Sequence, residues 1–303
     1  MRMLKPPIET VCPAGCSTSP PVVFALAGRD VRRCGGCGLY LLETQAGLDT
    51  AAQLDRSKFD DAFRELRSEN YGHILDAVGR VRGLSGARVL DVGCSSGWFL
   101  AAAARRGSVC YGIEPDRYFY ERARRALPGE VRLVNGFFDA DLPGDWPMFD
   151  LITFHDVFEH LDDPLRVLDA CTRRLAPRGL LVLSVPSADG FVFRLGLALR
   201  RLGSEGPLAR AFQVHYPFPH LYYFARRSLE TLVRLAGFDV VRMLPLRGFR
   251  LRGSLRRAQM DRADGGAGRL AGYANGAALA AFALLQPVVP ADNIVAILRR
   301  KTE

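Results

Sequence analysis

The sequence lacks several features that would direct its interpretation elsewhere. Among its 41 basic residues only Lys5, Lys58 and Lys301 are lysine, and no segment repeats at a fixed period. Met1–Thr10 contains no apolar stretch ahead of a small-residue cleavage site, so we expect no secretory signal peptide. Without such a signal, the seven cysteines indicate free thiols or metal ligands and not a disulfide framework. We therefore expect a cytoplasmic protein.

Composition and charge define the class of protein. With 303 residues, 49% of them hydrophobic and 24% charged, the chain can bury one large core, alone or with a small satellite. The net charge of +9 is uneven, because residues 194–303 hold 18 basic and 7 acidic side chains. This imbalance predicts an anionic partner for the last third: nucleic acid, a phosphate-bearing substrate or a membrane surface.

From Arg88 onward, short β-rich runs alternate with helical stretches. Strands are expected at Arg88–Val92, Val109–Ile113, Val131–Val134, Asp150–Phe154, Leu180–Val185, Phe238–Met243 and Asp292–Arg299. Helices are expected at Asp55–Arg82, Trp98–Arg106, Tyr118–Leu127, Pro164–Leu175 and Ser228–Ala236. The alternation predicts an α/β fold with a doubly wound, mostly parallel sheet, whose ligands bind beyond the carboxyl ends of the strands.

The same reading gives a domain organisation. Residues 1–45 form a cysteine-containing module with too little apolar sequence for a core of its own. Residues 46–86 are a helical lead-in, and residues 87–303 form the α/β domain. Insertions at about 187–225 and 246–290 interrupt that domain, and the first of them is predicted to be a cap.

A glycine-containing loop follows the first expected α/β strand. Gly93 ends that strand and Gly97 precedes the next helix, so the backbone can turn sharply and approach a ligand closely. The next strand ends at Glu114, where a carboxylate can accept both hydroxyls of a ribose. Dinucleotide enzymes prefer G-x-G-x-x-G, and this spacing does not provide it, which disfavours a nicotinamide dehydrogenase.

The segments VLDVGCSSGWFL and GIEPD resemble the first two motifs of class I S-adenosylmethionine (SAM) methyltransferases, although Ser95 replaces the familiar middle glycine. The resemblance implies a seven-stranded Rossmann-like fold and SAM as cofactor. It also implies that Gly93 and Gly97 flank the methionine part, that Asp91 holds its ammonium through water, and that Glu114 binds the ribose. The adenine contact would fall to Phe138 or Asp139.

Further motifs resemble a subgroup that contains ubiquinone-type O-methyltransferases and sugar methyltransferases. They are FDLITFHDVFEHLDDP, LAPRG and PHLYYF. For a hydroxyl acceptor the chemistry calls for a base, and histidine titrates near neutral pH. We predict His220 as the base and His160 as the second choice. Glu159 would orient an imidazole or hold a substrate hydroxyl, and His155 would contact the cofactor.

Two pairs of cysteines mark the N-terminal module. Cys12 and Cys16 are separated by about 17 residues from Cys34 and Cys37. Four thiolates in two short turns suit tetrahedral Zn²⁺, and a site with four protein ligands is closed, so we predict a structural zinc ribbon. A similar ribbon precedes many members of the methyltransferase subgroup. The remaining thiols, Cys94, Cys110 and Cys171, fall in the α/β pattern and are predicted to be packed in its core.

Residues 270–291 carry no charge but contain Asn275, Gln286, Pro287 and Pro290. A helix packed on the sheet, an interfacial helix on an anionic bilayer and a membrane span all remain open, with the span disfavoured because a sheet strand is expected after it. An anionic membrane surface is therefore an open partner for a protein peripheral on the inner face of the membrane.

Together these features predict SAM-dependent O-methylation of a small or lipid-linked acceptor, such as a sugar or quinol-type hydroxyl. C-methylation of a keto-sugar and RNA methylation are the enzymatic alternatives, and a SAM-fold scaffold is the non-enzymatic one. Nucleic acid is disfavoured, because the arginines lie beside apolar sequence and are not interleaved with stacking aromatics. The acceptor, the methylated atom and the oligomeric state stay open.

Overall fold

The computed structural model describes residues 11–43, 56–216, 218–246, 248, 284 and 288–301. Most of the predicted insertion at 246–290, including most of the uncharged stretch 270–291, lies outside these residues. Within the described part of the chain, no helix is long and apolar enough to cross a membrane.

The chain divides into two compact units that each combine distant segments. The first unit comprises Met1–Gln53, Phe154–Leu244 and Asp292–Glu303. The second unit comprises Leu54–Thr153 and Pro245–Ala291.

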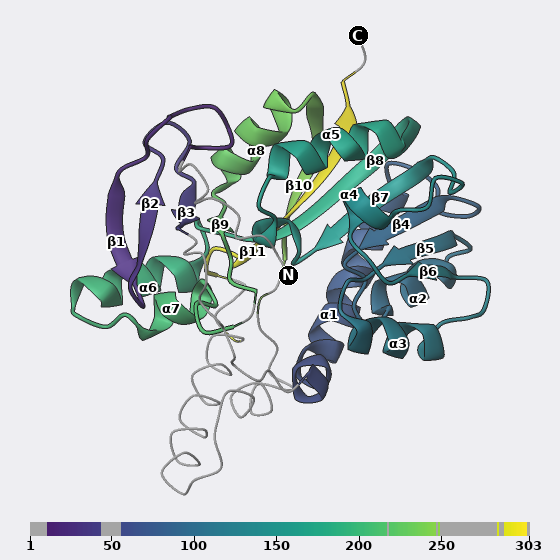
Figure 1. Cartoon of the computed structure of the whole chain (residues 1–303), viewed down its shortest axis with the longest axis horizontal. Helices are drawn as coiled ribbons and strands as arrows, with labels where there is room; N and C mark the ends of the chain where they lie inside the picture. Colours follow the sequence, from purple (N-terminus) through teal and green to yellow (C-terminus); the bar gives the residue numbers. More distant parts are fainter. Residues whose placement is uncertain are drawn as a thin grey trace, which may run out of the picture. The chain divides into compact units, whose positions relative to one another are not determined.

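A seven-stranded sheet has the order β10-β11-β8-β7-β4-β5-β6 (Figure 1). Its strands are β4 (Arg88–Val92), β5 (Val109–Ile113), β6 (Arg132–Val134), β7 (Phe149–His155), β8 (Leu175–Pro186), β10 (Phe238–Leu246) and β11 (Asn293–Arg300). β4, β5 and β6 pair in parallel, and β11 runs antiparallel to β8 with Val295 opposite Ser184. Strand β7 is buried along its whole length, as expected for a central strand of such a sheet. The predicted α/β class and sheet are confirmed.

Among the described residues of the second unit, four helices connect or precede the strands: α1 (Arg56–Gly79), α2 (Trp98–Ala104), α3 (Arg117–Ala126) and α4 (Phe138–Asp141) (Figure 1). Asp116 caps α3, because its side chain accepts a hydrogen bond from the backbone N–H of Tyr118. Helix α2 buries Phe99, whose ring meets Tyr71 of α1 edge to face at 5.5 Å. The long helix α1 is thereby packed against the helix that follows β4.

In the first unit, α5 (Pro164–Arg174) and α8 (Arg226–Leu235) match the predicted helices to within two residues. Asp163 accepts from the N–H of Arg166, and Pro164 occupies the first turn of α5, where its missing N–H costs nothing. Strand β8 begins five residues earlier than predicted, at Leu175. Arg178 adopts a left-handed φ of 61° there, a bend in the strand that a periodicity argument does not detect.

The cysteine-containing module forms a second sheet with the order β1-β2-β3-β9. Its strands are β1 (Val22–Leu26), β2 (Arg29–Arg33), β3 (Tyr40–Leu42) and β9 (Tyr222–Tyr223). The last strand comes from the predicted cap, which also contributes α6 (Phe191–Arg201) and α7 (Gly206–Ala211), drawn beside β1 and β2 in Figure 1. The two parts share one core, in which Leu26 and Val31 of the module pack with Phe193, Leu208 and Phe212 of the cap. Described residues of the module and of the cap are thus buried together in one hydrophobic cluster.

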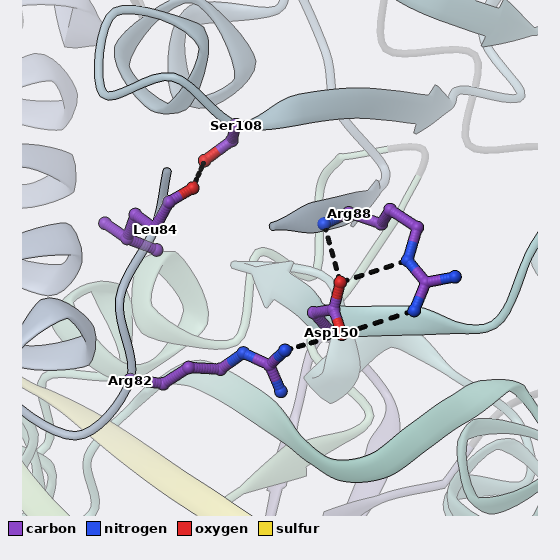
Figure 2. A network of polar contacts seen from close by, with 5 residues as sticks. All are labelled: Arg82, Leu84, Arg88, Ser108 and Asp150. Atoms are coloured by element: carbon purple, nitrogen blue, oxygen red, sulfur yellow. Dashed lines mark hydrogen bonds and ion pairs between the residues drawn. The ribbon is translucent and has the colours of Figure 1, made fainter. Parts of the chain in front are cut away.

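An ion-pair cluster ties the starts of β4 and β7 together within the second unit (Figure 2). Asp150 accepts from the backbone N–H of Arg88 at 2.9 Å and from its Nε at 3.0 Å, and Arg82 Nη2 donates to the other oxygen at 2.6 Å. Burial alone would raise the pKa of Asp150. The hydrogen bonds from Arg88 and the charge of Arg82 outweigh it, so the pKa lies below its ordinary value.

We expect Asp150→Asn to lower the free energy of unfolding by about 1–3 kcal/mol at neutral pH, because two arginines lose a charged acceptor. Denaturant unfolding measures this. A carboxyl group with a lowered folded-state pKa stabilises above its unfolded pKa and loses that contribution as the pH falls through the folded value. The difference between wild type and variant should therefore shrink in acid. Asp169→Asn is the control, since Asp169 pairs with Arg173 on an exposed helix face, and a similar loss in both variants would contradict the argument.

Candidate functional site

A tight turn follows β4 in the second unit. The N–H groups of Gly93 and Cys94 both donate to the carbonyl of Ile113, at 2.8 and 3.2 Å, and Gly97 N–H donates to the Cys94 carbonyl at 2.8 Å. The turn contains three residues with left-handed φ values: Gly93 (70°), Ser95 (48°) and Gly97 (80°). Glycine adopts this conformation without strain, whereas serine is strained in it. At Gly97 a Cβ would lie 2.5 Å from Leu127 Cδ1, so the Leu127 side chain would have to move to accommodate any other residue.

Glu114 anchors this turn from the end of β5. Its Oε2 accepts from the N–H of Ser95 at 2.8 Å, and its Oε1 accepts from the N–H of Asp116 at 2.9 Å. Burial raises the pKa of Glu114 to about 7, although these two hydrogen bonds favour the ionised form. The carboxylate lies at the position that the sequence predicted for a ribose contact, and it is held in place by backbone donors.

Asp91 is the second acid of the site and is buried in β4. Thr153 Oγ1 donates to Asp91 Oδ1 at 2.8 Å. Burial raises the pKa of Asp91 to about 8, and the charge of Glu114 contributes in the same direction. Two buried acids with raised pKa values favour a ligand that carries positive charge, because such a ligand stabilises their ionised forms.

The segment after β6 borders Glu114. Asn135 Nδ2 donates to the Glu114 carbonyl at 2.7 Å, and the N–H of Phe137 donates to Asp141 Oδ2 at 2.7 Å. Of the two predicted adenine contacts, Phe138 is buried at the start of α4 and Asp139 follows it in the same helix. Asp141, an acid that was not predicted from the sequence, accepts a hydrogen bond from the backbone of this loop.

The sequence analysis also missed Asp60 of α1. This carboxylate is fully buried and accepts from Ser96 Oγ at 2.6 Å, and Arg122 Nε lies 3.1 Å from the same oxygen. No motif pointed to it, because it lies in a helix more than 30 residues before the glycine loop. Such a contact is decided by tertiary packing and carries no local signal.

The predicted catalytic residues Glu159, His160 and His220 come together in the first unit. One carboxylate oxygen of Glu159 and one imidazole nitrogen of each histidine all lie within 4.8 Å of one another. Glu159 and His220 are buried. His220 Nε2 is 3.8 Å from Glu159 Oε1, and the centroids of the His160 and His220 rings are 4.7 Å apart. His160 Nδ1 lies 2.9 Å from the carbonyl oxygen of Pro219. His155, the predicted cofactor contact, is buried at the end of β7.

His220 is a neutral imidazole at neutral pH. Burial lowers its pKa well below the ordinary histidine value, and the charge of His160 lowers it further. A neutral imidazole can accept a proton, which is the state a general base requires. The adjacent carboxylate of Glu159 would stabilise the imidazolium once it formed.

Leu221, which lies between His220 and β9, forms two backbone hydrogen bonds. The N–H of Leu221 donates to the Glu159 carbonyl at 2.8 Å, and the N–H of Leu42 donates to the Leu221 carbonyl at 2.9 Å. Tyr40 and Leu41 of β3 pair with Tyr223 and Tyr222 of β9. The backbone next to His220 is thus bonded both to Glu159 and to the cysteine-containing module.

The four predicted metal ligands also come together in the first unit. The sulfur atoms of Cys12, Cys16, Cys34 and Cys37 all lie within 4.8 Å of one another, and Cys12 and Cys37 are 3.6 Å apart. The hydrogen bond from Cys37 lowers the pKa of Cys12 to about 5, which favours a thiolate. A compact set of four sulfurs with one stabilised thiolate fits the donor chemistry of a tetrahedral zinc site.

The other three cysteines are buried and reduced, as predicted for core residues. Burial raises the pKa of Cys94, Cys110 and Cys171, to about 12 for Cys110. These thiols are therefore protonated and poor nucleophiles.

A family model described as a methyltransferase domain matches residues 63–243, which is more than half of the chain. A solved SAM-dependent methyltransferase of Geobacter sulfurreducens, in complex with S-adenosylhomocysteine (SAH), resembles this structure with a TM-score of 0.52 at 17% identity. The match covers 81% of this chain and 98% of that one. At this identity the likeness shows the fold.

Curated ubiquinone biosynthesis O-methyltransferases are similar to part of the chain. The protein of Alkalilimnicola ehrlichii is 35% identical over 114 residues, which are 36% of this chain and 46% of the relative. The protein of Xanthomonas campestris pv. campestris is 36% identical over 129 residues, which are 41% of this chain and 53% of the relative. The chain thus spans about half the length of these relatives.

Proposed function

The chain belongs to the methyltransferase domain family, and on this premise we propose that it transfers a methyl group from SAM to an oxygen of a quinol-type acceptor. The observation that carries the proposal is the turn at Gly93–Gly97 with the Glu114 carboxylate beside it. SAM supplies the activated methyl group when bound. Asp91 would face its ammonium group, Glu114 its ribose hydroxyls, and Phe138 or Asp139 its adenine.

The proposed acceptor is a hydroxyl on a small or lipid-linked molecule. The names of the curated relatives support this class, and so does a buried, neutral histidine beside a carboxylate. His220 would take the proton from the acceptor hydroxyl at its imidazole nitrogen, and Glu159 would stabilise the imidazolium that results. His160 would help to orient the acceptor, and His155 would lie on the cofactor side.

A lipid-linked acceptor also supports a peripheral contact with an anionic membrane surface. Helix α6 exposes Arg194 and Arg201, and Leu202 directly after it is 83% exposed. An exposed apolar side chain next to an arginine, with a further exposed arginine on the same helix, is typical of segments that rest on an anionic bilayer.

We further propose that Cys12, Cys16, Cys34 and Cys37 bind one structural zinc ion. The compact sulfur cluster supports this, and four protein ligands would leave no open position for catalysis. Cys34 and Cys37 lie in the segment between β2 and β3, so the metal would brace the strand that pairs with β9.

If Glu114 binds the ribose, Glu114→Gln should weaken SAH binding about tenfold or more at pH ~8, because an ionised acceptor is lost. For the wild type, a pKa of about 7 means that the carboxylate becomes neutral as the pH falls below that value. Wild-type affinity should therefore decline from pH ~8 to pH ~6. The decline should be smaller in the variant, in which Asp91 still titrates but residue 114 does not. Isothermal titration calorimetry measures both, with Glu121→Gln on α3 as control. Equal affinity of wild type and Glu114→Gln would remove Glu114 from the ribose site.

The decisive activity test combines methyl-labelled SAM with a hydroxylated quinol and, separately, with a cell extract. Label should enter the organic phase. His220→Ala should lower kcat at saturating acceptor about a hundredfold or more, because the proton acceptor is gone. His215→Ala is the matched control, since His215 is an exposed histidine of the same segment. Near-wild-type turnover of His220→Ala would refute its role as base, and ribonuclease-sensitive label would identify an RNA methyltransferase.

Metal analysis by mass spectrometry should find about one zinc ion per chain in protein purified without chelators. Cys34→Ser should lose the metal and unfold at lower denaturant concentration, because the segment joining β2 and β3 is no longer tied. Cys171→Ser is the control, since that thiol is buried away from the cluster. A wild-type protein with clearly less than one zinc ion per chain would exclude the proposed site.

A further inference from the structure

We infer that Asp60 of α1 is a positioning residue for the cofactor: it fixes the turn after β4 through the hydroxyl of Ser96. The inference rests on the proposed function, because it assumes that this turn binds SAM. It extends the site to a helix that carries none of the expected methyltransferase motifs.

Three elements of the second unit meet at this carboxylate. Asp60 comes from α1, Ser96 from the turn and Arg122 from α3. Ser96 Oγ donates to Asp60 Oδ2 at 2.6 Å, and Arg122 Nε lies 3.1 Å from that oxygen. The carboxylate is fully buried, while the Arg122 side chain is 36% exposed. Arg122 offsets the cost of burying the charge, and the short bond from Ser96 is the contact that reaches the turn.

The turn needs such an anchor because it is strained. Ser95, next to Ser96, has a φ of 48°, a left-handed conformation that is strained for residues other than glycine. Where most family motifs have glycine this chain has serine, so the conformation must be imposed by its contacts. Two carboxylates impose it. Glu114 accepts from the N–H of Ser95, and Asp60 accepts from the side chain of Ser96.

Glu114 and Asp60, the two carboxylates that hold the turn, have different roles when the cofactor binds. Glu114 is proposed to accept the ribose hydroxyls, so the oxygens that accept from the N–H groups of Ser95 and Asp116 must also serve the ligand. Asp60 is fully buried, accepts from Ser96, and is not among the residues proposed to contact the cofactor. Asp60 is therefore the anchor that can preserve the turn while Glu114 engages the cofactor.

The test measures SAH affinity by calorimetry and the midpoint of thermal unfolding without ligand. Ser96→Ala removes only the hydroxyl, and we expect SAH to bind about tenfold more weakly with little change in the unfolding midpoint. Asp60→Asn keeps an oxygen acceptor for Ser96 but loses the charge that pairs with Arg122, so it should fall between wild type and Ser96→Ala. KM for SAM should rise in both variants, with kcat at saturating SAM retained, as expected for weakened cofactor binding.

Two variants serve as matched controls. Ser108→Ala removes a similar hydroxyl, which donates to the Leu84 carbonyl away from the turn (Figure 2). Asp76→Asn breaks another ion pair of α1, that with Arg106. Both should bind SAH like the wild type. A double-mutant cycle of Asp60→Ala and Ser96→Ala should be non-additive, since both changes remove the same bond.

The outcomes separate the two claims. If wild type binds SAH and Ser96→Ala binds it equally well, the positioning role is overturned and the proposed function stands. Loss of thermal stability in Asp60→Asn with unchanged SAH affinity would likewise reduce Asp60 to a structural residue. If the wild type does not bind SAH at all, the proposed function fails, and this inference fails with it.

Discussion

The hydrogen bond from the N–H of Ser95 to the Glu114 carboxylate is the interaction on which the site depends. The backbone after β4 has to turn within five residues and leave its amides close to a ligand, which requires left-handed conformations at Gly93, Ser95 and Gly97. Glycine supplies two of them without strain, and the third is held by a carboxylate from the neighbouring parallel strand. The turn therefore keeps its shape only while β4 pairs with β5, because that pairing places Glu114 beside Ser95. A change that weakens this part of the sheet should also weaken the site.

The first unit solves a different problem, that of a small module without a sufficient core. Strands β1 to β3 offer one apolar face, and the cap offers Phe193, Phe212 and Tyr223, which pack together on it. Neither part could bury this surface alone. One consequence is that β3 continues into β9 by backbone hydrogen bonds, and Leu221 is held between Leu42 and Glu159. The backbone beside His220 is therefore connected to the cysteine-containing module by backbone hydrogen bonds. Side-chain substitutions do not remove these bonds.

Much of this architecture follows from local patterns in the sequence. The strands at Arg88–Val92 and Val109–Ile113 occur as predicted, because short β-branched runs, glycine turns and an acid at a strand end are all encoded within a few residues. The cysteine spacing likewise predicted which thiols would cluster. The contacts of Asp60 and the pairing of β9 were not predictable in this way. Both join segments far apart in the chain. Neither an acid among several in a helix nor a pair of adjacent tyrosines contains a local signal of its partner.

Burial acts in opposite directions on the titratable groups of the two units. It raises the pKa of Asp91 and Glu114 and lowers that of His220, so each group is biased towards its neutral form. In the proposed reaction, the preference for the neutral form would matter for both the acids and the histidine. A cofactor with an ammonium and a sulfonium group would favour the ionised forms of these acids. Part of the free energy of binding would then come from the attraction between the positive ligand and the two carboxylates. A histidine that stays neutral until an acidic hydroxyl arrives can accept a proton without first losing one. The same physical effect thus prepares one group of residues for a cationic ligand and the other for a proton donor.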